Sequence, residues 1–272
     1  MVNNPIPADR ARWGRFDELG EHNLAVLQNI LEKAASTSHA RTPVEQKIGD
    51  FYASCMDEDQ INKLGTKPLQ AEFGRIDAIS GKGGLLDELV RLHRLGANVL
   101  FSFASGQDAK DSTQVIAQAD QGGLSLPDRD YYTKEDEKSK ELRAGFVAHV
   151  TRMFQLLGEP ESQAAAHAQA VMNIETELAK GALDNVARRD PQKTYHKMTV
   201  AELTSLCPFL NWPKFFDGMA APSIQSLNVA EPTFFRTVES VVVQTSLDDL
   251  KTYLRWQYLN GEAALLPKAF VD

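Results

Sequence analysis

The sequence has few cysteines, no long apolar run and no block of basic residues. Cys55 and Cys207 are its only cysteines; they form no disulfide framework, and their spacing matches no metal-binding pattern. No window approaches the ~20 continuous apolar residues that a membrane helix needs. Lys and Arg number 29 against 37 Asp and Glu, a net charge of −8. This acidic balance argues against nucleic acid or an anionic membrane surface as the main partner.

Local catalytic and metal-binding motifs are missing as well. A zinc peptidase helix needs two histidines one turn apart with a glutamate beside the first, and no pair of histidines in this chain is that close. The segment Gly81–Gly84 lacks the Lys-Ser/Thr ending of a phosphate loop. We therefore predict no catalytic residue and no metal ligand in these 272 residues. The six histidines are His22, His39, His93, His149, His167 and His196.

Apolar residues recur at helical spacing along most of the chain, which predicts amphipathic helices. In the segment 164–182 the packing positions include Ala168, Val171 and Glu175. Another helix is predicted from Thr133, which forms a Thr-x-x-Asp capping pattern with Asp136. The predicted helices cover residues 16–34, 45–57, 70–79, 85–95, 133–157, 164–182 and 247–259, with shorter helices after residue 196.

The apolar period changes to two in one region only. Val99, Phe101 and Phe103 fall on one side of the segment 98–104, and the segment 113–119 has the same period after the polar stretch 105–111. This pattern predicts a β-hairpin near residues 98–119. The expected fold is therefore mainly α, a multi-helix lobe with one hairpin.

Several strings are too particular to be generic helix or loop. The most informative is GGLSLPDRDYY at residues 122–132, in which two glycines and Pro127-Asp128 favour turns. The others are IPADRARWGRFDEL at 6–19, FYASCMDE at 51–58, RRDPQKTYH at 188–196 and YLRWQYL at 253–259. In this order and spacing the strings resemble the N-terminal half of the neprilysin-like zinc metallopeptidases.

The resemblance implies that this chain is one of two lobes that act together in a larger enzyme. In that family two mainly helical lobes enclose a chamber, and a zinc in the C-terminal lobe cleaves small peptides. Residues 1–272 would be the noncatalytic N-terminal lobe, which walls the chamber and positions peptide substrates. Zinc would belong to the full-length parent rather than to this fragment. The resemblance also implies an extracytoplasmic parent, although the polar segment 1–13 is not a signal peptide and no membrane contact is expected from this segment.

The resemblance assigns a role to two residues, Arg12 and Asp17. In the family, the arginine matching Arg12 meets the carboxylate at the substrate's C-terminus, and the acid matching Asp17 supports it. A guanidinium matches a carboxylate bidentately, so the chemistry is sensible. A second family arginine corresponds to Gly20, which weakens the expected preference for a free C-terminus. The alternative is a local Arg12–Asp17 ion pair that orders the start of the chain.

Other interpretations stay open. A stand-alone helical binding module derived from the same lobe is the main alternative, and an unrelated hydrolase with a dispersed site is a third. Arg189 and Asp190 are expected to form a buried or half-buried pair before Tyr195, and Tyr131 and Tyr132 to be packing residues with hydrogen-bonded hydroxyls. The resemblance makes Cys55 half of a disulfide with a cysteine beyond residue 272, and the alternative is a free thiol.

Overall fold

The computed structural model describes residues 6–8, 10, 13–36, 38 and 40–272. The chain divides into two compact units, residues 1–64 and residues 65–272. The mainly α prediction is confirmed, because helices account for most of the described residues in both units. Among these residues no helix is long and apolar enough to cross a membrane.

The first unit consists of three helices, α1 (Arg15–Ala35), α2 (Pro43–Cys55) and α3 (Glu58–Leu64). α1 ends well before Pro43, at Ala35, and Pro43 is the first residue of α2. Thr42 caps that helix, since its Oγ1 accepts the Glu45 N–H at 3.2 Å and its own N–H donates to Glu45 Oε2 at 2.8 Å. A Cβ on Gly49 would lie 2.0 Å from the Ala34 carbonyl oxygen, so glycine permits the contact between α1 and α2.

The apolar stripe predicted for the first helix exists but is not buried. Of α1's described side chains only Ala34 is buried, and Phe16 is 92% exposed. On α2, Phe51 is 73% exposed, and Cys55 is exposed and free.

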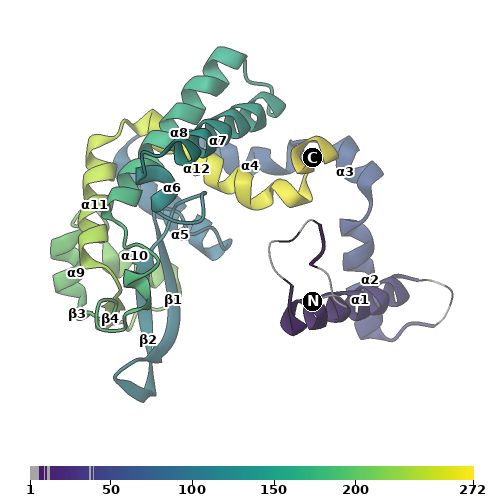
Figure 1. Cartoon of the computed structure of the whole chain (residues 1–272), viewed down its shortest axis with the longest axis horizontal. Helices are drawn as coiled ribbons and strands as arrows, with labels where there is room; N and C mark the ends of the chain where they lie inside the picture. Colours follow the sequence, from purple (N-terminus) through teal and green to yellow (C-terminus); the bar gives the residue numbers. More distant parts are fainter. Residues whose placement is uncertain (1–5, 9, 11–12, 37, 39) are drawn as a thin grey trace. The chain divides into compact units, whose positions relative to one another are not determined.

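The second unit holds most of the helices (Figure 1). The prediction for residues 85–95 is confirmed: Gly96, with φ +91°, ends that helix. The α-helices of this unit are α4 (Gln70–Asp77), α5 (Leu85–Arg94), α6 (Asp130–Thr133), α7 (Glu137–Leu156), α8 (Glu161–Gly181), α9 (Val200–Leu206), α10 (Trp212–Gly218), α11 (Pro232–Gln244), α12 (Leu247–Glu262) and α13 (Lys268–Val271). Short 3₁₀ turns are η1 (Lys67–Leu69), η2 (Lys82–Gly84), η3 (Ala187–Arg189) and η4 (Ala263–Leu265).

The helix predicted from Thr133 begins instead at Glu137, so the predicted cap is wrong. Asp136 is the N-cap, and its Oδ1 accepts the Ser139 N–H at 3.0 Å. Thr133 is the last residue of α6, and its hydroxyl donates to the Arg129 carbonyl. Thr and Asp both cap helices. The extended backbone at Lys134 ends α6, so the next helix can begin only after it, with Asp136 as its cap.

The predicted hairpin is present, but its strands are longer than expected. They are β1 (Phe101–Asp108) and β2 (Asp111–Gln121), and only two residues separate them. Most of the polar stretch expected to be the turn is therefore strand. Figure 1 shows this long ribbon extending away from the helices.

Two short strands were not predicted, β3 (Lys197–Thr199) and β4 (Ser226–Val229). They complete a four-stranded sheet in the order β1-β2-β4-β3, in which β2 and β4 run parallel. Each is too short to show an alternating pattern, so only the packed fold reveals it.

The core of the second unit is rich in aromatic rings. Phe101 is fully buried, and its ring centroid lies 4.8 to 5.7 Å from those of its four ring neighbours, His93, Trp212, Phe215 and Phe235. Predicted packing positions of α8 are buried, Glu175 among them. This core fixes the helices and the hairpin that surround the pocket described next.

Candidate functional site

Of the two residues predicted to meet a substrate carboxylate, the structure describes only Asp17. Arg12 lies outside the described residues. Asp17 lies in the first turn of α1, where its Oδ2 accepts the Gly14 N–H at 2.8 Å. That contact stabilises the start of the helix.

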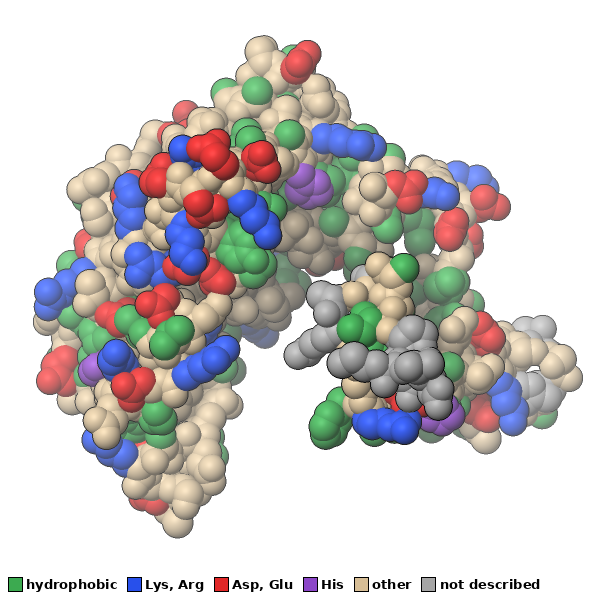
Figure 2. Space-filling model, viewed as in Figure 1, with side chains coloured by type: hydrophobic (Ala, Val, Ile, Leu, Met, Phe, Trp, Pro, Cys, Tyr) green, Lys and Arg blue, Asp and Glu red, His purple; other side chains and the backbone are tan. Residues whose placement is uncertain are grey.

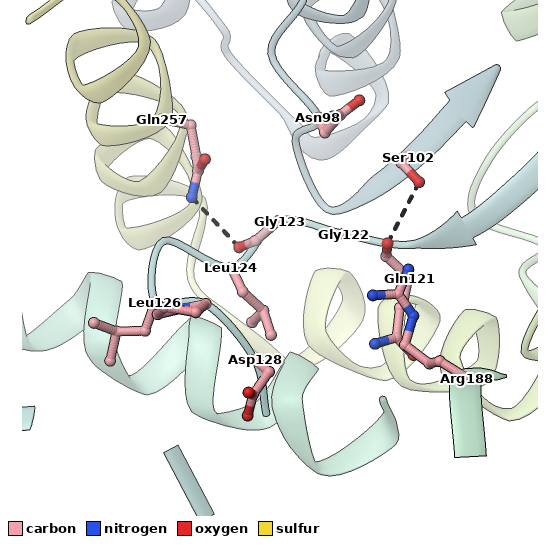
Figure 3. Close-up of a pocket in the computed structure, with 11 residues that line it drawn as sticks. Asn98, Ser102, Gln121, Gly122, Gly123, Leu124, Leu126, Asp128, Arg188 and Gln257 are labelled. Atoms are coloured by element: carbon pink, nitrogen blue, oxygen red, sulfur yellow. Dashed lines mark hydrogen bonds between the residues drawn. The ribbon is translucent and has the colours of Figure 1, made fainter. Parts of the chain in front are cut away.

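A polar pocket of about 350 Å³ lies in the second unit, at the string singled out in the sequence (Figure 3). Its wall is the loop Gly122–Asp128, which leaves the end of β2. Side chains from the start of the hairpin, from η3 and from α12 complete it: Asn98, Ser102, Gln121, Arg188 and Gln257. The volume falls within the range of small-ligand sites, and the lining includes three amides and one hydroxyl beside the glycines and apolar residues of the loop.

The two glycines allow the wall to lie directly on the neighbouring backbone. A Cβ on Gly122 would be 2.7 Å from the carbonyl carbon of Phe101. Gly123 has φ +73°, and a Cβ there would lie 2.4 Å from the Tyr253 hydroxyl oxygen. That hydroxyl donates to the Gly123 carbonyl at 2.9 Å and accepts the Leu100 N–H at 3.1 Å. Larger residues would displace the wall.

A buried carboxylate holds the other side of the wall. Glu175 of α8 is fully buried and accepts four hydrogen bonds. Its Oε1 accepts Ser125 Oγ at 2.6 Å and Gln257 Nε2 at 2.9 Å; its Oε2 accepts Ser125 N at 3.0 Å and Tyr132 Oη at 2.5 Å. Burial raises the pKa of Glu175 to about 7, against the lowering effect of the hydrogen bonds from Ser125 and Tyr132.

Tyr132 confirms the prediction of a packing residue with a bonded hydroxyl, since that hydroxyl also accepts the Leu126 N–H at 2.8 Å.

The rim of the pocket carries two charged groups that are tied to neighbours. Arg188 pairs with Asp120 at 3.0 Å, with 43% of its side chain exposed. Asp128 Oδ2 accepts Asn185 Nδ2 at 2.7 Å. The predicted Arg189–Asp190 pair is wrong: Arg189 is exposed, and Asp190 Oδ1 instead accepts the Gln192 N–H at 3.0 Å. Among the described residues it is Arg188 that forms the ion pair.

A pair of neighbouring carboxyl groups, Glu72 of α4 and Glu88 of α5, lies away from this pocket. Glu72 is 3% exposed and accepts Arg91 Nε at 2.6 and 2.8 Å. Burial raises the pKa of Glu88 to about 7, and the hydrogen bond to Glu72 and its charge add to the effect. Burial alone would raise the pKa of Glu72, but hydrogen bonds from Arg91 and Glu88 lower it. Within the described part of the chain, Glu88 Oε1 is buried without a partner.

Two of the described histidines, His93 and His167, have polar contacts with neighbouring residues. His93 is buried, with Nε2 3.0 Å from the Val99 carbonyl oxygen, and burial lowers its pKa to about 4. His167 Nδ1 lies 2.7 Å from Glu159 Oε2. In the described ranges no group of three or more His, Cys, Asp or Glu side chains is arranged to hold a metal ion.

Sequence reasoning placed Glu175 correctly in a packed helix face but missed its hydrogen bonds. The available signal was an acidic residue at an apolar position of an Ala-rich helix, because a buried carboxylate needs several donors. Which donors these are depends on α6, α12 and the loop 122–128, far away in sequence.

Comparison with known proteins places this architecture in a family. The family model for peptidase family M13, in its N-terminal part, matches residues 1–272. Neprilysin-3 of Drosophila melanogaster is 31% identical over 293 residues, which cover 100% of this chain and 37% of that protein. Endothelin-converting enzyme 1 of Mus musculus is 33% identical over 283 residues, covering 99% of this chain and 36% of that protein. The chain thus spans little more than a third of these relatives.

Solved structures agree with the sequence matches. The Mycobacterium tuberculosis zinc metalloprotease Zmp1 in complex with an inhibitor superposes with a TM-score of 0.89 at 31% identity, over 98% of this chain and 41% of that one. PepO of Lactobacillus rhamnosis shares the fold, with a TM-score of 0.80 at 17% identity, over 99% of this chain and 42% of that one. The predicted resemblance to neprilysin-like peptidases is therefore confirmed, and the chain belongs to peptidase family M13, of which it represents the N-terminal part.

Proposed function

We propose that this chain is the noncatalytic lobe of a zinc-dependent metalloendopeptidase, where it helps to form a chamber and positions small peptide substrates. The observation that carries the proposal is the match along the whole chain: a zinc metalloprotease shares this fold over 98% of the chain, while the chain covers only 41% of that enzyme. Its partners would be peptides and the catalytic lobe.

The zinc of the proposed parent does not fit the described residues of this chain. None of their His, Cys, Asp and Glu side chains form a group of three that could bind it. The contribution proposed for this chain is therefore selection and positioning of the substrate. On the family resemblance we also propose an extracytoplasmic location for the parent.

Arg12 and Asp17 remain the residues proposed to meet the carboxylate at the substrate's C-terminus. The chemistry supports this role, because a guanidinium binds a carboxylate through two parallel hydrogen bonds. Asp17 Oδ2 accepts the Gly14 N–H, which leaves its second oxygen, Oδ1, for a guanidinium.

The test begins with the gene beyond codon 272. We expect an open frame with an H-E-x-x-H motif, and zinc-dependent hydrolysis of small peptides by the complete protein. In that protein, Arg12→Gln should raise KM for a peptide with a free C-terminus by roughly tenfold or more and leave KM for its amide nearly unchanged.

Arg15→Gln, at an exposed position paired with Glu18 in the same helix, is the matched control. A stop codon after residue 272 would favour the stand-alone binding module instead. Equal effects of Arg12→Gln on the acid and the amide would contradict the carboxylate contact.

A further inference from the structure

One side of the loop Gly122–Asp128 contacts the core, and the other side lines the pocket. Its inner side makes hydrogen bonds to the core: the Ser125 N–H and hydroxyl bind Glu175, the Leu126 N–H binds Tyr132, and the Gly123 carbonyl binds Tyr253. Its outer side forms the wall of the pocket. The shape of that wall is therefore set largely from within, by Glu175, Tyr132 and Tyr253, which do not line the pocket.

Glu175 is the centre of these inner contacts. Its four donors come from three separate parts of the chain, the loop, α6 and α12. Trp256 Nε1 also donates to Ser125 Oγ at 2.8 Å. A buried charge costs free energy, and a well-packed apolar residue is often at least as stabilising at such a site. Stability alone does not explain a carboxylate here, whereas fixing the loop does.

The outer side offers groups that suit an extended peptide. Asn98 carries an amide and Ser102 a hydroxyl, and Gln257 donates its amide N–H to Glu175 but keeps its Oε1 as an acceptor, whereas both ends of the Gln121 amide bind the Leu183 backbone. Such side chains both donate and accept, as peptide main-chain N–H and C=O groups do. Arg188 adds a partly exposed guanidinium at the rim that can donate to a carbonyl or carboxylate oxygen in addition to Asp120.

We propose that this pocket is a peptide-binding subsite of the lobe, taking main-chain amides of an extended segment, and that Glu175 is its positioning residue. The choice of a peptide as ligand rests on the proposed function. The pocket's geometry and the role of Glu175 rest on the contacts above.

The ionisation of Glu175 provides a readout that a purely structural residue would not give. All four groups that face its oxygens are donors, so they favour the carboxylate over the protonated acid. The titratable groups around it are Tyr132 of α6 and Tyr253 of α12, and burial raises the pKa of both, so they stay neutral. On α7, His149 lies 5.9 Å from the Trp256 ring, and a His149→Gln variant separates its effect.

The experiment measures binding of a blocked tetra-alanine peptide to the 272-residue chain by saturation-transfer NMR, at pH 8 and pH 6. Wild type and His149→Gln should bind more weakly at pH 6. Glu175→Gln should bind roughly tenfold more weakly at pH 8 and lose the pH dependence, because its amide places a donor against donors. Glu177→Gln, an exposed position on the same helix, should behave as wild type.

Ser102→Phe gives a test that does not depend on Glu175, since a ring at this strand position fills the pocket and should abolish binding. Unchanged binding by Ser102→Phe, or no binding by wild type, would overturn the subsite. Unchanged affinity of a folded Glu175→Gln at both pH values would overturn the positioning role, and if that variant does not fold, the pH dependence of wild type and His149→Gln decides it. None of these assays needs catalysis, so an inactive complete protein would refute the proposed function separately.

Discussion

The two units use the same kind of helix but bury it very differently. In the first unit, α1 spans 21 residues and α2 spans 13, yet each has one buried residue among those described, Ala34 and Gly49. In the second unit, α8 has the same length as α1 and buries eight. Apolar periodicity thus forms a helix in both places, but only layers of neighbouring elements turn the apolar face into a core.

The surface charges of the second unit are mixed in sign. On the face of this unit that Figure 2 shows, Lys and Arg side chains are interspersed with Asp and Glu, without a large block of one sign. The charges with large consequences are instead the few carboxyl groups inside the core.

The largest expected effect comes from the aromatic core of the second unit. Phe101→Ala should lower the free energy of unfolding by about 3–5 kcal/mol, because it removes a fully buried ring that contacts four others. Urea denaturation followed by tryptophan fluorescence measures this loss. A loss below about 1 kcal/mol, close to the value for an exposed site, would mean that this core is not what stabilises the unit.

The next effect is a pH dependence confined to the second unit. The pKa values of Glu88 and Glu175 are raised to about 7 in the fold, so the folded state binds more protons than the unfolded state between pH 4.5 and 7. The free energy of unfolding should fall as pH rises through this window, by up to roughly 3 kcal/mol per group.

Denaturation at pH 5 and pH 8 measures this difference. Glu88→Gln should remove its share, and Asp87→Asn, the exposed neighbour, should not. Stability that rises with pH in this range would contradict the assignment. The lowered pKa of Glu72 acts in a separate, more acidic window, where its contribution is lost as pH falls.

A smaller effect tests the contact that the first unit does have. Gly49→Ala should destabilise the α1–α2 contact by roughly 1–3 kcal/mol, because its Cβ would clash with the Ala34 carbonyl oxygen. Hydrogen exchange of amides in 15–55 measures the loss. Gly20→Ala, where a Cβ meets nothing within 4 Å, is the matched control and should stabilise α1 slightly. Equal exchange in both variants would refute the close contact.

The smallest effect should come from the exposed aromatic residue of α1. Phe16→Ala should change the free energy of unfolding by less than about 0.5 kcal/mol, since the ring is 92% exposed. Paired with Phe101→Ala, it gives the same substitution in each unit. A loss as large as that of Phe101→Ala would show that Phe16 is buried in solution, and the comparison between the units would fail.

Particular residues show how far the sequence reaches. The predicted helix 85–95 ends where the structure ends α5, before Gly96, because a positive φ at a helix end favours glycine. Thr133 and Asp136 can each cap a helix, and the start predicted at Thr133 is wrong because local rules do not distinguish the two. The pocket could be suspected from Gly122 and Gly123, but its lining from η3 and α12 could not, because no local pattern links residues more than sixty positions apart.

The sequence by itself determined the helical class, the hairpin and the family, because periodicity, turn residues and ordered motifs are local properties. The tertiary structure alone decided which apolar faces are buried, that β3 and β4 extend the hairpin into a sheet, and that Glu175 binds a distant loop. These outcomes depend on which elements meet in space. Burial and hydrogen bonding are set by the neighbours that folding supplies, and the same pattern of residues therefore yields an exposed α1 and a buried α8.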